Sequence, residues 1–437
     1  MRITVLGTGY LGATHAACMA ELGFTVLGMD SDPEKVVMLS AGRLPLYEPG
    51  LEELIRRHLK SGRLRFTTSY KEVAQFAAVH FICVGTPQKS GEYGADIQFV
   101  EKAVDSLAPY LVEPSLVVGK STVPVGTAEL LAERLIKQAP IGSQAELAWN
   151  PEFLREGFAI QDTLTPSRLV FGVGSSRAEL LLRQVYKTAL AEGVPLIVTD
   201  LLTAELVKVS ANAFLSTKIS FINAMAEICE ATGADVAQLS QALSYDLRIG
   251  GRYLEPGLGF GGGCLSKDIR AFMARAGELG VAHALAFLRE IDSINMRCRT
   301  RMVDLAREQC EGAFLGKRIA VWGAAFKPDS DDIRDSPALQ VAASVQLEGA
   351  QVTVYDPKAA DNARKSFPNL SYAASAMEAA VDAHLVLHLT EWHEFRDLEP
   401  AMVGDVVTIR RIVDGRNVLN AELWRSAGWT YCALGRP

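Results

Sequence analysis

Cys264 stands in a sequence setting that could make its thiol reactive. It follows the glycine-rich run GFGGG at residues 259–263, and apolar residues at helical spacing begin directly after it. Glycines let a backbone pass close to a ligand, and the amino-terminal end of a helix favours the thiolate, the nucleophilic form of cysteine. The pattern therefore indicates a nucleophile. A small buried cysteine after an ordinary glycine turn is the simpler alternative.

Polar residues at helical spacing could assist this cysteine. Asp268 comes four residues after Cys264, on the same face of the expected helix, and Lys267 adds a positive charge beside it. In another expected helix, Lys208 and Asn212 lie one turn apart on a polar face. If they point into a cleft, they could donate hydrogen bonds to an oxyanion. The alternative is a solvated lysine and an asparagine that packs against a neighbouring helix.

Three polar clusters follow expected strands, at residues 85–87, 120–124 and 150–156. Ligands of doubly wound sheets bind at the carboxyl ends of the strands, where these clusters would lie. Glycine, proline, asparagine and serine are also ordinary turn residues, so turn chemistry explains many of these positions. Glu152 and Glu156 exceed what a turn requires, and we interpret them as candidate active-site acids.

The first thirty residues have the pattern of a dinucleotide-binding unit. A short apolar run ends at the sequence GTGYLG, residues 7–12, and a helical pattern, a second apolar run and Asp30 follow it. The glycines allow a tight turn and a close approach of the backbone to a pyrophosphate, and the carboxylate of Asp30 suits the ribose hydroxyls. Because that carboxylate would repel a 2′-phosphate, we expect NAD as the cofactor and not NADP.

Alternating strand and helix signals predict an α/β fold with two Rossmann-like doubly wound domains joined by a central helical region. In the first half, further parallel strands are expected at residues 79–84, 116–119, 146–149, 168–172 and 196–199. In the second half, strands are expected at residues 318–322, 352–355, 385–389 and 406–413, and a helix is expected to begin at Ser336 and Pro337. This second unit lacks the dinucleotide glycines. Long helical patterns at residues 203–232 and 282–310 lie between the two.

The composition argues against several classes of partner. The chain has 437 residues, of which 49% are hydrophobic and 22% charged, and its net charge is −7. This balance argues against nucleic acid or an anionic membrane as a partner. Seven cysteines are scattered without metal-ligand spacing, so we expect no metal site, and reduced thiols in the cytoplasm. The sequence shows neither a signal-peptide layout nor an apolar run long enough to span a bilayer.

Eight ordered sequence stretches resemble those of one known family. They are GTGYLG at 7–12, VGTP at 84–87, KSTVPVGT at 120–127, NPEFLREG at 150–157, AELVKVSANAFLSTKISFIN at 204–223, GFGGGCLSKD at 259–268, FKPDSDDIRDSP at 326–337 and DGRN at 414–417. Together, over almost the whole chain, they closely resemble the nucleotide-sugar 6-dehydrogenases, the UDP-glucose/GDP-mannose dehydrogenase family. The resemblance implies an NAD-binding Rossmann domain at residues 1–200, a central helical domain with the cysteine and dimer contacts at residues 201–300, and a nucleotide-sugar-binding Rossmann-like domain at residues 301–437.

The resemblance also implies a reaction. UDP-glucose would be oxidised to UDP-glucuronate in a four-electron reaction with two NAD in succession, through a thiohemiacetal and a thioester on Cys264, and the enzyme would be a homodimer. Lys208 would stabilise the developing oxyanion with help from Asn212. Protons and the hydrolytic water would be handled by Asp268, Thr122 and Glu152.

The resemblance carries two sets of binding residues. The implied NAD contacts are Gly7, Gly9, Tyr10, Leu11, Gly12, Asp30, Lys35, Thr86, Thr122, Glu156, Lys267 and Arg334. The implied contacts of the sugar nucleotide are Phe153, Leu154, Arg155, Glu156, Lys208, Asn212, Tyr253, Leu254, Glu255, Pro256, Gly257, Gly261, Lys327 and Arg416, with Arg248 reaching in from a partner subunit.

The chain departs from the family pattern at one position, and at other positions it resembles two different members of the family. The residue before the cysteine is Gly263, where the family usually has serine, and we expect the turn to be looser there. Pro256 and Gly257 resemble the GDP-mannose enzymes, whereas residues 248–250, the 120–127 stretch and the tail at residues 433–437 resemble the UDP-glucose enzymes. We therefore expect UDP-glucose as the substrate. The alternatives are a GDP-mannose 6-dehydrogenase and a non-catalytic protein that binds a nucleotide sugar.

Overall fold

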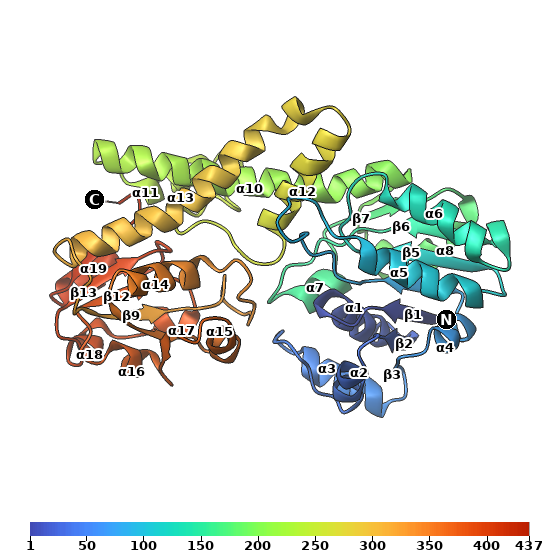
Figure 1. The fold of residues 1–437 in the computed structure, drawn as a ribbon, viewed down its shortest axis with the longest axis horizontal. Helices are drawn as coiled ribbons and strands as arrows, with labels where there is room; N and C mark the ends of the chain where they lie inside the picture. Colours follow the sequence, from blue (N-terminus) through green and yellow to red (C-terminus); the bar gives the residue numbers. More distant parts are fainter. Residues whose placement is uncertain (437) are drawn as a thin grey trace. The chain divides into compact units, whose positions relative to one another are not determined.

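The computed structural model describes residues 1–436, and Figure 1 shows them coloured along the chain. The chain forms two compact units, one made of residues 1–211 and 270–280 and the other of residues 212–269 and the chain from residue 281 onward. Helices α10 (Leu201–Thr232) and α12 (Leu265–Glu278) contribute residues to both units. The division into domains at residues 1–200, 201–300 and 301–437 stays a prediction.

The first unit is built on an eight-stranded sheet with the order β3-β2-β1-β4-β5-β6-β7-β8. The first six strands in this order follow the Rossmann arrangement, which confirms the predicted fold class. The strands are β1 (Arg2–Leu6), β2 (Thr25–Met29), β3 (Leu64–Thr67), β4 (Val79–Ile82), β5 (Ser115–Gly119), β6 (Ala145–Trp149), β7 (Leu169–Gly172) and β8 (Leu196–Thr199).

One pairing in this sheet differs from the expectation. Strand β7 pairs antiparallel with β6, through Trp149 and Gly172, whereas the sequence pattern predicted a parallel strand at residues 168–172. The segment that joins β6 and β7 holds one six-residue helix, α7 (Ala159–Leu164), in place of the longer crossover helix that a parallel connection uses. The prediction of a wholly parallel sheet was therefore wrong at this step.

Helices cover both faces of the first sheet. Alternate residues of β1 show this, because Ile3 and Val5 belong to one buried apolar cluster and Leu6 belongs to another. The helices are α1 (Tyr10–Glu21), α2 (Pro33–Ser40), α3 (Leu51–Lys60), α4 (Tyr70–Phe76), α5 (Gln98–Leu107), α6 (Thr127–Gln138), α7, α8 (Ser176–Val185) and α9 (Lys187–Ala191). Burial on both faces leaves the ends of the strands as the places where polar loops gather.

The second unit contains a six-stranded parallel sheet with the order β11-β10-β9-β12-β13-β14. This is the same Rossmann order as in the first sheet. The strands are β9 (Arg318–Trp322), β10 (Gln351–Tyr355), β11 (Ser371–Tyr372), β12 (Leu385–His388), β13 (Arg411–Asp414) and β14 (Thr430–Ala433). The helices around it are α14 (Pro337–Leu347), α15 (Ala360–Ser366), α16 (Ala376–Ala380), α17 (His393–Arg396), α18 (Pro400–Gly404) and α19 (Ala421–Ser426). Ser336 caps α14 by accepting the amide of Leu339, as its position before Pro337 predicts.

The strand expected at residues 406–413 is shorter than predicted, because β13 begins only at Arg411. The amides of Thr408 and Ile409 both donate to the carbonyl of Ala383, which precedes β12, so these residues lie outside the ladder. The prediction was therefore wrong for residues 406–410, which precede the strand and do not belong to it.

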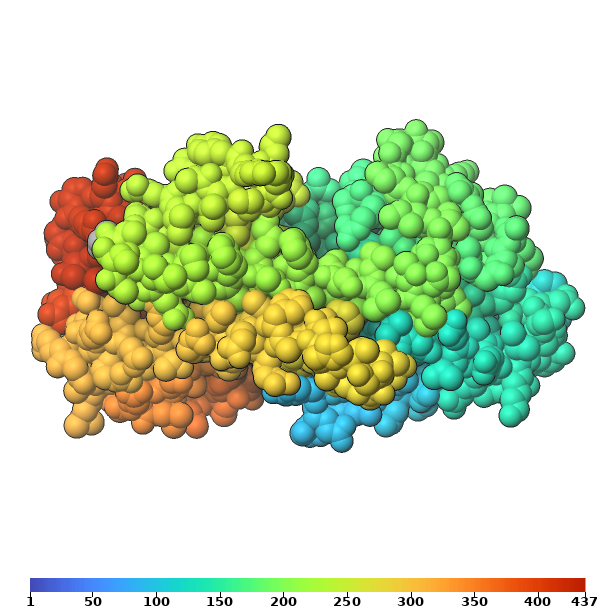
Figure 2. Space-filling view, turned by 90° about the horizontal axis from the view of Figure 1, so that it is seen from above, coloured from blue at the N-terminus to red at the C-terminus, as the bar shows by residue number. Residues whose placement is uncertain are grey.

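A helical region completes the second unit. It comprises the second part of α10, helix α11 (Val236–Ser244) and helix α13 (Ala286–Gln309). Helices α10 and α13 lie side by side in Figures 1 and 2, and the hydroxyl of Ser220 donates to the carbonyl of Ile291 at 2.9 Å. The central helical region expected from the sequence is therefore present.

Within residues 1–436, no helix combines the length and the apolar character that crossing a membrane requires.

A buried acid at the end of β13 organises the loop that follows it. The carboxylate of Asp414 accepts hydrogen bonds from the next loop's amides and from Tyr431, and it pairs with Nδ1 of His388 at 2.8 Å. Both members of this ion pair are fully buried. Burial by itself raises the pKa of Asp414, but His388 and the amide hydrogen bonds outweigh it and lower the pKa to about 2.

We predict that Asp414→Asn lowers the free energy of unfolding by about 3–5 kcal/mol, because it leaves a buried partner uncompensated and turns an NH2 group toward amide donors. Urea unfolding followed by tryptophan fluorescence measures this, since Trp149 alone of the five tryptophans lies in the other unit. The control is Asp382→Asn, which removes an exposed ion pair with Arg318 and costs about 1 kcal/mol or less. Equal unfolding midpoints for the two variants would contradict the prediction.

Candidate active site

The glycine turn between β1 and α1 has the geometry of a dinucleotide cradle. Gly7 has a φ of +84°, and a Cβ at Gly12 would lie 1.7 Å from the Gly7 carbonyl oxygen, so neither position accepts a larger residue. At Gly9 a Cβ would meet nothing within 4 Å. The turn is therefore closed on its protein side and open at the amino-terminal end of α1, where a pyrophosphate would meet backbone amides.

Asp30 lies at the end of β2, beside this turn. Its carboxylate accepts hydrogen bonds from the amide of Thr8 at 2.9 Å and from Nζ of Lys35 at 3.0 Å. Burial raises the pKa of Asp30, but these hydrogen bonds outweigh it and the net shift is downward, so the group is ionised at neutral pH. The structure thus brings Asp30 and Lys35 together, and an ionised acid here fits NAD better than a cofactor with a 2′-phosphate.

The loops after β4 and β5 are hydrogen-bonded to each other. The hydroxyl of Thr86 donates to the carbonyl of Thr122 at 2.8 Å, which places these two predicted NAD contacts at one edge of the sheet. Lys120 is buried, and its ammonium donates to Oδ1 of Asn150 at 2.9 Å. Three successive loops at the carboxyl ends of the strands therefore form one connected edge.

Glu152 and Lys208 form a buried pair within the first unit. Nζ of Lys208 lies 3.0 Å from Oε1 of Glu152, and the two side chains are 8% and 14% exposed. The other carboxylate oxygen of Glu152 accepts the amide of Leu154, and the Lys208 ammonium lies 5.7 Å from the ring centroid of Phe153. A lysine held this way can donate to an oxyanion, and its carboxylate partner can hold a proton or a water. Arg155 pairs instead with Asp162, at 2.7 Å.

One buried acid in this region was missed by the sequence reasoning. The carboxylate of Glu48 accepts the amides of Gly157 at 2.6 Å and Ala159 at 2.7 Å, and it also accepts the hydroxyl of Tyr10. Burial and the Glu48 carboxylate raise the pKa of Tyr10. The side chain of Tyr10 therefore lies on the loop that contains Glu156, although its backbone begins α1. No local motif marks Glu48, because its two amide partners lie more than one hundred residues away.

In the second unit, Cys264 lies directly before the first residue of α12, as predicted, and its carbonyl accepts the amide of Asp268 at 2.9 Å. Among the seven cysteines, all within the described residues, it is the exposed one. Burial raises the pKa of Cys18 and Cys83 to about 12 and that of Cys298 to about 11. The alternative of a small buried cysteine at position 264 is therefore wrong.

Asp268 lies one turn further along α12 and is 2% exposed. One carboxylate oxygen accepts Nδ2 of Asn212, and the other accepts Nζ of Lys267, each at 2.6 Å. The structure therefore brings together three of the predicted residues near the cysteine. Lys208 and Asn212 are one turn apart along α10, as expected, but they belong to different units.

Gly259 and Gly261, before the cysteine, are required by neighbouring protein groups. A Cβ at Gly259 would lie 2.3 Å from Oδ1 of Asn295, and one at Gly261 would lie 2.4 Å from the carbonyl oxygen of Asp335. At Gly263, the position where serine was expected from the family pattern, a Cβ would lie 2.2 Å from the guanidinium carbon of Arg334, which is the far end of a flexible side chain and can move away. The loop thus packs tightly against the segment that contains the predicted NAD contact Arg334.

Arg416 joins three loops of the second unit. Its guanidinium donates to the carbonyls of Leu389 at 2.7 Å, Phe326 at 3.0 Å and Gly259 at 3.2 Å. This places Arg416 beside Lys327 and the glycine loop, which are the predicted contacts of the sugar nucleotide. Residues 253–257, which are also predicted contacts of the sugar nucleotide, lie near the loop that contains Arg416. Asn417 donates to the carbonyl of Pro256, and a Cβ at Gly257 would lie 2.6 Å from the Gly415 carbonyl oxygen. Arg248 stands apart, with a side chain 90% exposed that pairs with Asp246.

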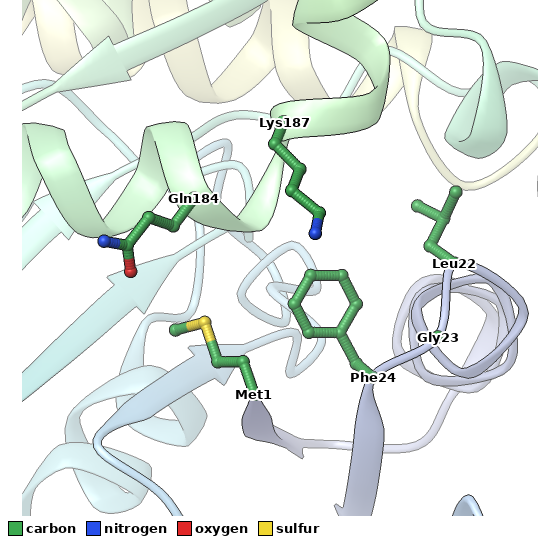
Figure 3. A pocket seen from close by; sticks show the side chains of 6 residues that line it. All are labelled: Met1, Leu22, Gly23, Phe24, Gln184 and Lys187. Carbon is green, nitrogen blue, oxygen red and sulfur yellow. The ribbon is translucent and has the colours of Figure 1, made fainter.

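A pocket of about 270 Å³ lies at the opposite end of the first sheet and is lined by Met1, Leu22, Gly23, Phe24, Gln184 and Lys187. Figure 3 shows the Lys187 side chain pointing toward the Phe24 ring. The pocket lies where β1 and β2 begin, whereas ligands of doubly wound sheets bind where the strands end. It is therefore separate from the predicted cofactor site.

Comparison with known proteins agrees with these features. Residues 1–190 match the NAD binding domain of the UDP-glucose/GDP-mannose dehydrogenase family, residues 202–297 its central domain and residues 320–421 its UDP binding domain. The chain is 38% identical to UDP-glucose 6-dehydrogenases of Rhizobium meliloti (strain 1021), covering all of both chains, and of Rickettsia conorii, covering 100% of this chain and 99% of that protein. It is also similar to the solved structure of a UDP-glucose dehydrogenase from the hyperthermophilic archaeon Pyrobaculum islandicum, with a TM-score of 0.90, 36% identity and coverage of 100% of this chain and 98% of that one. The expectation of NAD as the cofactor is thereby confirmed, and the chain belongs to the UDP-glucose/GDP-mannose dehydrogenase family.

Proposed function

We propose that this protein oxidises UDP-glucose to UDP-glucuronate with NAD and that Cys264 holds the sugar covalently during the second oxidation. The observation that carries the proposal is the exposed Cys264 at the amino-terminal end of α12, one turn from the buried Asp268 with its two donors. An alcohol oxidation that stops at the aldehyde needs no thiol nucleophile, whereas oxidation to the acid does. The names of the similar proteins and the UDP binding domain support UDP-glucose as the substrate.

The first oxidation removes a hydride from C6 of the sugar and a proton from its hydroxyl. When bound, NAD supplies the hydride acceptor. We propose that the Lys208 ammonium donates a hydrogen bond to the oxygen of this hydroxyl and stabilises its negative charge as the proton leaves. Glu152, 3.0 Å from that ammonium, accepts the proton and keeps the lysine in place.

The second oxidation uses the cysteine. Sγ of Cys264 forms a bond with the aldehyde carbon, its proton passes to Asp268, and Asn212 and Lys208 stabilise the oxyanion of the thiohemiacetal. Loss of a second hydride leaves a thioester. Water, positioned by Thr122 and Glu152, then attacks the carbonyl carbon, the C–S bond breaks, and the thiolate and the carboxylate separate. In total, one water is consumed, two hydrides are transferred and three protons are released.

We predict that the wild-type protein forms two NADH for each UDP-glucose and that Cys264→Ser lowers uronate formation about a thousandfold or more, because a serine hydroxyl cannot form the thioester. NADH absorbance and mass analysis of the sugar product measure both quantities. The control is Cys432→Ser, which changes a partly buried cysteine elsewhere and keeps the wild-type yield. Uronate formation by the Cys264→Ser protein at the control rate would overturn the mechanism.

The same assay separates the alternatives. A GDP-mannose 6-dehydrogenase would form NADH with GDP-mannose in preference to UDP-glucose. A non-catalytic nucleotide-sugar-binding protein would bind NAD and a sugar nucleotide but form no NADH, and Cys264→Ser would then change nothing measurable.

We further propose that the protein is a homodimer and acts in the cytoplasm, where reduced thiols persist. Three large apolar residues on α10 recur at intervals of seven, Phe214, Phe221 and Ile228, and they are 67%, 46% and 55% exposed. In Figure 2 the side chains of α10, in yellow-green, form a broad part of the visible face. Such a stripe suits self-association with the same helix of a second copy. The exposed Arg248 could then reach a partner's site, as the family resemblance implies.

We predict that Phe221→Glu weakens dimerisation about a hundredfold, because a charge would be buried at the contact. Sedimentation equilibrium over a dilution series measures the association constant. As a matched control, Leu347→Glu places the same charge at an 87% exposed leucine of α14 and leaves the association unchanged. Identical behaviour of the two variants would remove this α10 stripe as the dimer contact.

A further inference from the structure

The loop formed by residues 120–127 is attached at its far end by two side chains that the proposed chemistry does not use. Glu205 on α10 is 2% exposed, and its two carboxylate oxygens accept the amides of Gly126 at 2.7 Å and Ala128 at 2.6 Å. Arg275 on α12 donates from Nε to the carbonyl of Val125 at 2.9 Å. All of these residues lie in the first unit.

The near end of the same loop is fixed separately. Lys120 is buried against Asn150, and the carbonyl of Thr122 accepts the hydroxyl of Thr86 at 2.8 Å. Thr122 therefore lies between two anchors, the strand-end loops on one side and the pair of Glu205 and Arg275 on the other. If one anchor is released, the backbone at Thr122 is held from one side only.

Glu205 also has a fixed relation to the lysine of the proposed mechanism. It precedes Lys208 by three residues on α10, so the two side chains lie on the same side of one helix. Lys208 pairs with Glu152, and Glu205 holds the amides of the 120–127 loop. One helix therefore contacts two separate strand-end loops through neighbouring carboxylate interactions.

We infer that Glu205 and Arg275 are positioning residues that hold Thr122 in register with Lys208, and that the Glu205 attachment depends on ionisation of its carboxylate. The inference rests on the proposed function for the roles of Thr122 and Lys208. The geometry of the attachment stands independently of it.

The dependence on ionisation follows from the hydrogen bonds. Two amides donate to two different oxygens of Glu205, which requires both oxygens to be acceptors, and a protonated carboxyl would turn a hydroxyl toward one of the amides. The charged groups that act on Glu205 are Glu129 of α6 and Arg275 of α12, and on its own helix Lys208 is paired with Glu152. Burial raises the pKa of Glu205 to about 7, despite the two amide hydrogen bonds.

The attachment of the 120–127 loop to Glu205 should therefore strengthen as the pH rises. Above about pH 7 the carboxylate is ionised and both amides are held, whereas below it one attachment is lost. Stability changes in the opposite direction. The folded protein keeps the proton more tightly than the unfolded chain, whose ordinary pKa is 4.5, so unfolding becomes easier as the pH rises from about 4.5 to about 7.

The test measures NAD binding to the full-length protein by calorimetry between pH 6 and pH 8.5, with turnover as a second readout. We expect the wild-type affinity to rise about threefold to tenfold through pH 7. In Glu205→Gln the amide NH2 faces a backbone N–H at every pH, so the affinity should stay at the low-pH value and the step should disappear. Arg275→Met keeps the apolar part of the side chain but removes the donor, and it should weaken NAD binding and move the pH step upward, because the charge of Arg275 lowers the pKa of Glu205.

In the comparison variant Glu129→Gln, an exposed neighbour on α6 loses a charge that raises the pKa of Glu205, so the step should remain but move to lower pH. A Glu205→Gln protein that is folded by circular dichroism and keeps the wild-type pH step would overturn the inference. If the Arg275→Met protein bound NAD with wild-type affinity, the positioning role inferred for Arg275 would be overturned. If the wild-type protein bound NAD but oxidised no sugar, the proposed function would fail while the calorimetric test of the attachment would still be decided.

Discussion

Buried carboxylates that accept backbone amides are the interaction on which the loops of this protein depend. Loops that leave the carboxyl ends of buried strands carry N–H groups that have no ladder partner, and each one left unsatisfied costs about 1–3 kcal/mol. Asp30, Asp356 and Asp414 meet this need at the ends of β2, β10 and β13, and Glu48 and Glu205 meet it for longer loops. Of the residues proposed for chemistry, Thr122 and Glu152 are half-buried on such strand-end loops, whereas Lys208, Asn212 and Asp268 are buried on helices α10 and α12.

In both Rossmann-like sheets an aspartate follows the second strand, but its hydrogen-bond partners differ. Asp356 follows the second strand of its sheet, as Asp30 does, but it accepts the amides of both Ala324 and Ala325 and the indole N–H of Trp392. The first turn residue is closed by protein in both sheets, because a Cβ at Gly323 would lie 2.3 Å from the Thr390 hydroxyl and one at Gly7 would lie 2.7 Å from the Val84 side chain. The two turns therefore differ in the hydrogen-bond partners of the aspartate and not in the packing of their first glycine.

The parts that could be predicted from the sequence are those encoded by local patterns. The GTGYLG turn, the helix that starts after Cys264 and the cap formed by Ser336 each depend on residues within a few positions of one another. The antiparallel step between β6 and β7 and the short edge strands β3 and β14 carry weak local signals. The acceptors Glu48 and Glu205 could not be predicted, because their amide partners lie 77 to 111 residues away and any exposed glutamate would look the same in the sequence.

The surroundings of Cys264 illustrate why exposure and charge must be considered together. A carboxylate one helical turn from a thiolate would repel it, so Asp268 is an unfavourable neighbour when taken by itself. Asn212 and Lys267 each take one of its oxygens, so its charge is shared with a cation and a dipole. The amino-terminal end of α12 would favour the thiolate form of Cys264, and the proposed mechanism assigns the thiol proton to Asp268. The buried Asp268 is tolerated beside the proposed nucleophile because its two donors are already in place.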